Sequence, residues 1–390
     1  MSPYSPLCTY RLAPTLLFYI VLSNKAEVNS GKIVYILGAG FSAPFGLPVM
    51  RDFLIRAKDL YFTNTDKYAH FAKVLETIDA MHKAKTYFNV DLLNIEEILS
   101  ILDMEDHVSG ETRSKDFCRF IEDVISAYTP IAPTPCIEKV ADRKAYQNIR
   151  DLSGNDIFGN DSLWHSFGGF VGNLMNLRLT FEQFTTGYEQ RYNLNYSHID
   201  NALCSYSVIT MNYDLLLESV VKLINNYADP ANNAPSDALL RISKLHGSVG
   251  GEIVAPTWKK WVGATLKNAW QRAYEDLCSA TQLRILGYSL PVSDSYVRYL
   301  LEAAILKSKH LKNIDVVCRD DIEGLMEKRY RDFIKFKFMR FKSGDIKDYL
   351  VLSTPYRHYW SVNRHYVNGT PDFVFDYNHL ESVHRDYMEH

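Results

Sequence analysis

The sequence has no closely spaced cysteine pair, no apolar run of membrane-spanning length and no large excess of one charge. Its six cysteines stand far apart, and none belongs to a CxxC or CxxH pair: Cys8, Cys118, Cys136, Cys204, Cys278 and Cys318. This spacing excludes a zinc ribbon of the usual kind and argues against a disulfide framework. Scattered single cysteines are typical of a reducing compartment, so we expect a cytoplasmic protein.

The net charge is −3, so no global basic field is available to hold nucleic acid, although a local basic patch stays open. Hydrophobic residues make up 47% of the 390 residues and charged residues 23%, which is ordinary for a globular protein with a substantial core. At ~150 residues per domain, the length allows two or three units, or one large α/β domain with insertions.

An apolar segment, Leu12–Leu22, lies near the start of the chain. It is shorter than the ~20 residues that a membrane-spanning helix needs, so we expect no membrane insertion. It has the length of a signal-peptide core, but Pro14 lies inside it and no A-x-A cleavage site follows. We therefore treat residues 1–30 as an N-terminal extension, either packed on the core or outside the domain.

Short β-branched runs alternate with helical patterns, which predicts an α/β fold with a doubly wound, mainly parallel, Rossmann-like sheet. The expected strands are 32–37, 207–211, 240–245, 283–286 and 314–318. The apolar spacing between about 65 and 200 is mostly helical and predicts a helical insertion subdomain, with one helical pattern over 163–192. Residues 31–330 would form the nucleotide-binding domain, and residues 331–390 an edge strand at 333–342 followed by an aromatic-rich cap or tail.

A glycine-rich loop, Gly38–Ser42, follows the first expected strand and precedes a helix. Glycines there let the backbone turn tightly and approach a pyrophosphate, and a helix N-terminus offers free N–H donors. The spacing is not GxGxxG, and no acidic residue follows a second strand at ~20 residues. Taken alone, the loop is as compatible with a bare glycine turn as with nucleotide binding.

Polar residues follow three more of the expected strands, at the edge where open α/β sheets bind ligands. Asn212 and Asp214 come after the strand at 207–211, where Asp214 has the alternative role of capping the next helix. His246 comes after the strand at 240–245. An imidazole titrates near neutral pH and can take a proton from a sugar hydroxyl or a water, although a solvated loop histidine is the alternative.

The fourth segment, Gly287-Tyr288-Ser289 with Asp294 beyond it, follows the strand at 283–286 and leaves room for a flat ribose or base. In order, GAGFSAPFGLP, TMNYD, LHGS and GYSLPVSD resemble the motifs of the sirtuin superfamily over roughly residues 31–320. The resemblance extends to sirtuin-like NAD-hydrolysing proteins of prokaryotic antiphage defence, in which residues 94–97 and 255–260 also have counterparts.

The resemblance implies that the substrate is NAD and that each motif has a part in binding it. Catalysis would fall to Asn212 and His246, with Asp214 lining the nicotinamide and ribose pocket. The remaining implied NAD-binding residues are those of the glycine loop for the pyrophosphate and those beside the adenosine ribose: Gly38, Ala39, Gly40, Ser42, Gly287 and Ser289.

Three departures from the protein deacetylases of that superfamily favour NAD hydrolysis. The chain lacks the two CxxC pairs of their structural zinc, so no zinc is expected. The usual Gly-Ile-Pro-Asp-Phe-Arg is Gly46–Arg51 (GLPVMR), and Met211 replaces a glutamine. Protein deacylation, ADP-ribosylation and a non-catalytic subunit that binds NAD or ADP-ribose stay open. The resemblance also implies a homo-oligomer or a partner ATPase of the hexameric, DNA-translocating HerA type, without sequence-specific DNA binding by this chain.

Overall fold

The computed structural model describes eleven stretches of the chain: residues 31–84, 91–133, 162–186, 189–198, 204–228, 239–254, 264–319, 323–352, 362–367, 370–375 and 380–389. The predicted N-terminal extension and the segment 255–260 lie outside them. Within these ranges no helix has both the length and the apolar character to cross a membrane.

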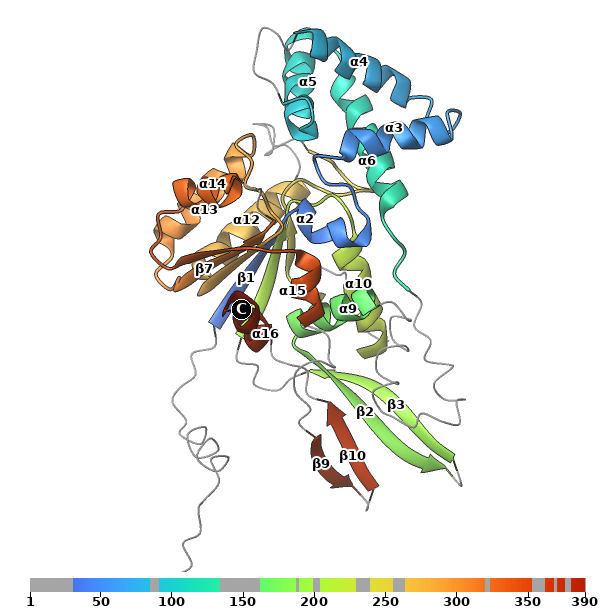
Figure 1. The fold of residues 1–390 in the computed structure, drawn as a ribbon, viewed down its shortest axis with the longest axis vertical. Coiled ribbons are helices and arrows are strands. Elements are labelled where there is room, and N and C mark those ends of the chain that lie inside the picture. The colour runs from blue at the N-terminus through green and yellow to red at the C-terminus, as the bar shows by residue number, and fades with distance from the viewer. Residues whose placement is uncertain are drawn as a thin grey trace, which may run out of the picture.

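Six parallel strands form the central sheet: β1 Gly31–Leu37, β4 Cys204–Thr210, β5 Ile242–Lys244, β6 Gln282–Leu286, β7 Asn313–Cys318 and β8 Met339–Ser343 (Figure 1). Their order is β5-β4-β1-β6-β7-β8, and every pairing is parallel. The chain adds β4 and β5 on one side of β1 and then β6, β7 and β8 on the other. The predicted doubly wound α/β fold is therefore confirmed, and its switch point lies at the carboxyl end of β1.

Helices cover both faces of this sheet because side chains alternate along each strand. Ile33 and Tyr35 face one apolar layer, whereas Val34 and Ile36 face the other. The first layer contains α9 Ser162–Leu174, α10 Leu216–Ala228, α15 Ile346–Leu352 and α16 Leu380–Glu389. The second contains α12 Ala264–Ser279, α13 Ser295–Lys307 and α14 Leu325–Phe333.

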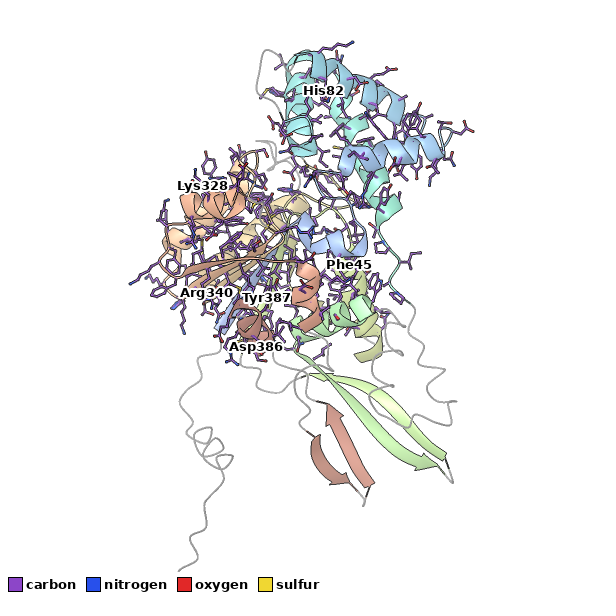
Figure 2. The ribbon with its side chains drawn as sticks, in the orientation of Figure 1. Phe45, His82, Lys328, Arg340, Asp386 and Tyr387 are labelled. Atoms are coloured by element: carbon purple, nitrogen blue, oxygen red, sulfur yellow. The ribbon has the colours of Figure 1, made fainter. Side chains whose placement is uncertain are left out.

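A helical unit follows β1 and the short α2 Ala39–Ser42, beyond the carboxyl ends of the strands (Figure 1). It consists of α3 Phe53–Thr63, α4 Phe71–Ala84, α5 Ile95–Ser109 and α6 Arg113–Tyr128. Its core is aromatic, with the rings of Phe71 and Phe120 centred 4.6 Å apart. Figure 2 shows His82 on α4 at the far end of this unit and Phe45 at its base, where Phe45 packs on Trp164.

A second, antiparallel sheet lies apart from the first (Figure 1). Its strands, in the order β3-β2-β10-β9, are β2 Leu177–Thr186, β3 Glu189–His198, β9 Val362–Val367 and β10 Thr370–Phe375. The prediction of a helical pattern over 163–192 is therefore wrong beyond Leu174, where α9 ends. Asn176 takes a positive φ of 52° and donates from Nδ2 to Cys204 O, which turns the chain into the β2–β3 hairpin.

The predicted edge strand at 333–342 is also only partly present, because Phe333 ends α14 and the strand begins at Met339. This strand, β8, is the edge of the central sheet, parallel to β7. The aromatic-rich cap or tail contains the strands β9 and β10 and the helix α16. The boundaries given for the domains stay predictions.

A row of polar side chains crosses the face of the sheet that α15 and α16 cover. Strand register places Tyr35, Arg284, Asp315 and Arg340 side by side, and we call them the charged row. Arg284 is buried and donates to Tyr35 Oη at 2.7 Å and to a carboxylate of α16, Glu381, at 2.6 Å. Arg340 donates to both oxygens of Asp315, at 2.7 and 2.8 Å.

The helix α16 contributes a second contact to the charged row. His384 is buried, its Nε2 lies 2.9 Å from Asp315 Oδ2, and its Nδ1 lies 3.0 Å from Tyr349 Oη. Figure 2 shows Arg340 and Tyr387 in this region, where the C-terminal helix meets the sheet. The charged row therefore holds α16 in one position, since a buried charge is tolerated only with its partners in place.

Candidate functional site

The four predicted site segments converge because β5, β4, β1 and β6 are consecutive in the sheet. Strand β4 pairs with β5 at an offset of 34 positions, as in Val208 with Ile242. The same offset separates Asn212 from His246, so both residues lie just past the ends of neighbouring strands. The structure thus places them on the same edge of the sheet, beside the switch point.

The glycines of the first loop are required by contacts within the protein. A Cβ at Gly38 would lie 2.7 Å from Gly287 O, and one at Gly40 would lie 2.8 Å from the same oxygen. Gly287 itself has a φ of +63°, and a Cβ there would meet Phe41 N at 2.4 Å. The two loops therefore pack backbone to backbone, and the predicted contact of Gly38 and Gly40 with a pyrophosphate stays a prediction.

The side chain of Asn212 joins the first loop to the end of β4. Its Nδ2 donates to Gly38 O and to Ser42 Oγ, both at 3.0 Å, so the carboxamide orientation is set by two acceptors. Its Oδ1 is buried and has no hydrogen-bond partner among the described residues. Because an unpaired buried oxygen is costly, this atom is suited to accept from a ligand.

The other predicted NAD-binding residues differ in their exposure and in their hydrogen-bond partners. Asp214 Oδ1 accepts from Leu216 N at 3.0 Å at the start of α10, so the capping role that its position allows is present. Ala39 is exposed, and Ser289 is half-buried with its carbonyl accepting from Arg329 Nη1 at 2.9 Å. None of these contacts by itself indicates a nucleotide.

His246 is fully buried between two carboxylates, which overturns the alternative of a solvated loop histidine. Its Nδ1 lies 3.4 Å from Glu96 Oε1 and its Nε2 lies 3.2 Å from Asp294 Oδ2. Asp294 is also fully buried and accepts from Tyr288 Oη at 2.8 Å. Each ring nitrogen therefore faces a carboxylate within ion-pair distance, and Asp294 is held in place by the phenol of Tyr288.

Glu96, on α5, is a site residue to which the sequence alone assigns no role. The side chain of Asn94 caps α5 by accepting from Glu96 N and Glu97 N, and its Nδ2 donates to Ser293 Oγ at 3.2 Å. These bonds tie the first turn of α5, which carries Glu96, to the loop before α13. A signal was present, because Glu96 is three positions before the buried Leu99 and thus lies on the apolar face of the helix.

Tyr213 completes the buried group around His246, with ring centroids 6.1 Å apart. Its hydroxyl is buried and has no hydrogen-bond partner within the described ranges. Burial raises the pKa of the phenol well above its ordinary value, and the negative charge of Glu96 adds to the shift. Tyr213 therefore stays neutral, with an O–H group able to donate.

Over the part of the chain that the structure describes, no group of three or more His, Cys, Asp or Glu side chains is placed to hold a metal ion. Since Cys8 and Cys136 lie outside the described residues, the expected absence of zinc stays a prediction.

The fold and the site define an α/β protein whose switch point brings together an amide, an imidazole and two carboxylates. Residues 206–338 match the model of the SIR2-like domain family. The match begins inside β4 and ends before β8. It includes Asn212, His246 and Asp294, but neither the glycine loop nor Glu96.

Similar solved structures are Sir2 proteins. One is Sir2Tm bound to a propionylated peptide, with 13% identity, 87% of this chain and 96% of that chain covered, and a TM-score of 0.31. A Sir2 complex with p53 peptide and NAD+ has 12% identity, coverages of 85% and 94%, and a TM-score of 0.31. Sir2 bound to acetylated peptide has 11% identity, coverages of 86% and 95%, and a TM-score of 0.32. No curated protein matches the chain.

Proposed function

We propose that this protein is an NAD+ glycohydrolase, which cleaves the bond between nicotinamide and ribose to give nicotinamide and ADP-ribose. The observation that carries the proposal is the buried group of Asn212, His246 and two carboxylates at the switch point of the central sheet. The match of residues 206–338 to the SIR2-like domain family supports it. Open α/β sheets bind nucleotides at this position.

The reaction needs positioning more than it needs a strong nucleophile. The C1′–N bond breaks with its electron pair leaving on nicotinamide, the oxygen of water bonds to C1′, and one water proton is released. Positive charge develops on the sugar as the bond breaks, as in glycoside cleavage. The protein must hold the ribose and the water and exclude bulk solvent.

The buried side chains fit a ribose, whose hydroxyls both donate and accept hydrogen bonds. Asn212 Oδ1 and Glu96 Oε2 are acceptors without a hydrogen-bond partner among the described residues. Tyr213 Oη is a neutral hydroxyl that also lacks a partner there. Asn212 would orient the ribose or the water through its amide. His246 would supply the imidazole of the site, with a carboxylate facing each of its ring nitrogens.

The experiment is chromatography of NAD incubated with the purified protein. His246→Ala should lower nicotinamide release by about 10²–10⁴-fold, the size of effect typical of acid–base groups, whether the imidazole acts directly or through a neighbouring group. Asn212→Ala should lower it as well, because the amide that orients the ribose or the water is lost. Asn226→Ala and His310→Ala are matched controls at exposed positions and should leave the rate unchanged. Wild-type rates in the two site variants contradict the assignment. Product that forms only with an acetyl-lysine peptide indicates transfer to protein instead of hydrolysis.

We further infer that the activity depletes NAD in the cytoplasm during antiphage defence, as the sequence resemblance implies. Uncontrolled NAD loss would harm the host, so the activity would be held off until a trigger. A homo-oligomer or a HerA-type ATPase partner would supply that control. Light scattering after size-exclusion chromatography, with and without the candidate partner, tests assembly. A monomer that neither self-associates nor binds the ATPase, yet is fully active, contradicts it.

A further inference from the structure

The buried histidine raises a question of access. His246 has no exposed surface, and both of its ring nitrogens face carboxylate oxygens within 3.4 Å. The Asp294 side is closed firmly, because Asp294 is fully buried, accepts from Tyr288 and directly precedes α13. A substrate hydroxyl therefore cannot contact the imidazole unless a carboxylate is displaced.

Glu96 offers an alternative that requires no displacement. One oxygen, Oε1, lies on the imidazole, whereas the other, Oε2, is buried without a partner among the described residues. Its side chain is 10% exposed against 0% for His246. A buried carboxylate oxygen without a hydrogen-bond donor lowers the stability of the folded protein. Glu96 Oε2 is therefore expected to accept a hydrogen bond from a ligand in the working protein.

We propose that Glu96 is a catalytic residue, and that His246 acts through it as a positioning residue. This inference rests on the proposed function and deepens it. Glu96 Oε2 accepts a hydrogen bond from a hydroxyl of the ribose that carries nicotinamide. The negative charge of the carboxylate offsets the positive charge that develops on that sugar as the C1′–N bond breaks. No proton has to leave the substrate at this atom.

The chain delivers Glu96 to this place by a specific arrangement. Asn94 caps α5 and also donates to Ser293, so the first turn of α5 is tied to the loop that carries Asp294. His246 bridges the two carboxylates, 3.4 Å from Glu96 and 3.2 Å from Asp294. Asp294 thus contacts His246, and His246 contacts Glu96 Oε1. The other oxygen of Glu96, Oε2, is left to contact a ligand.

Glu96→Gln tests the role, because glutamine keeps the size of the side chain and removes the charge. We expect kcat to fall by about 10²–10³-fold, comparable to the removal of one group that stabilises a developing charge, with a change in KM of a few-fold at most. Glu97→Gln, one position along the same turn, should match the wild type. A wild-type or faster rate in Glu96→Gln overturns the proposal.

The double variant Glu96→Gln, His246→Ala separates a shared role from two separate ones. Residues that act as a unit are strongly non-additive, so the double variant should be about as slow as the slower single variant. Effects that multiply would show that His246 acts on the substrate independently of Glu96, which overturns the proposed order. Thermal unfolding of each variant checks that the fold is retained.

A binding measurement distinguishes this inference from the proposed function. ADP-ribose has the second ribose and ADP lacks it, so calorimetry with both isolates contacts to that sugar. Glu96→Gln should weaken ADP-ribose binding by about a few-fold and leave ADP binding unchanged, because a hydrogen bond to a charged acceptor is replaced by one to a neutral amide. If the wild type releases no nicotinamide, but Glu96→Gln still binds ADP-ribose more weakly than the wild type and binds ADP equally well, the hydrolase assignment fails and the Glu96 contact stands. Equal losses for both ligands, or no ADP-ribose binding by the wild type, overturn the contact.

Discussion

At the scale of single residues, the positions of greatest constraint are those where two backbones meet. Gly287 has a positive φ and also lies against Phe41 N, whereas Gly46 has a φ of +89° with no atom within 4 Å of its Cβ position. The two glycines share the left-handed conformation and differ in the space around them. A comparison between them separates backbone strain from steric contact.

Gly287→Ala should destabilise the protein more than Gly46→Ala. Both variants force alanine into the left-handed region, at a cost of roughly 1–2 kcal/mol. Only Gly287→Ala adds a clash with backbone, which cannot move without separating the glycine loop from β6. Urea unfolding of the two variants measures the difference, and equal losses would contradict the close packing of the loops.

At the scale of helices and strands, the charged row makes the docking of α16 sensitive to pH. Burial lowers the pKa of His384 from 6.5 to about 4, despite the opposing effect of Asp315. Between these two values the unfolded chain binds a proton that the folded protein does not. Stability should therefore fall as the pH is lowered through this window. The lowered pKa of Asp315 acts only below its ordinary value of 3.8, outside the window.

His384→Gln should flatten this part of the stability profile. A single group contributes at most about 1.4 kcal/mol per pH unit, and that slope should disappear from the free energy of unfolding between pH 6.5 and 4. His310→Gln, at an exposed position, is the control. Urea titrations at several pH values give the slopes. An unchanged slope in His384→Gln would show that other groups control acid stability.

The central sheet was predictable because its strands are short, apolar and β-branched, and they end at glycine or polar residues. The hairpin at 177–198 was missed although Leu177, Leu179 and Phe181 alternate, because the helical spacing before it was extended across the turn at Asn176. The helix α16 was missed because its buried face, which begins at Leu380 and Val383, continues with a histidine and a tyrosine that mask the apolar period.

The site was predictable up to the strand ends and no further. Parallel register brings Asn212 and His246 to one edge, and that follows from the order of strands along the chain. The contact of His246 with Glu96 does not follow from it, since Glu96 comes from an insertion whose position on the sheet depends on tertiary packing. Sequence therefore identified the imidazole but not the carboxylates that enclose it.

At the scale of the whole molecule, the helical unit contacts the sheet and its loops on either side of the site. On one side, Glu96 lies against His246, and Asn94 donates to Ser293. On the other is the loop after His246, where Gly250 N donates to Glu122 on α6 at 2.8 Å and Cys118 Sγ donates to Ile253 O at 3.6 Å. The site is thus complete only while the helical unit stays docked.

Ligand binding should therefore slow hydrogen exchange in the helical unit as well as at the sheet. ADP-ribose should protect the first turn of α5, residues 95–98, together with 287–294, because both face the proposed ribose position. Residues 380–389 of α16 cover the charged row away from these loops and serve as the internal control. Mass spectrometry of the exchanged peptides measures the pattern. Protection confined to the strand ends would contradict a ligand contact from the helical unit.

The charged row also has a consequence for how the chain folds as it leaves the ribosome. Arg284 and Asp315 are synthesised well before Glu381 and His384, which pair with them in the finished protein. Until Glu381 emerges, Arg284 has no carboxylate partner among the described residues and its guanidinium has to stay hydrated, whereas Asp315 already has Arg340. That face of the sheet should therefore close last, after the C-terminal helix has been made.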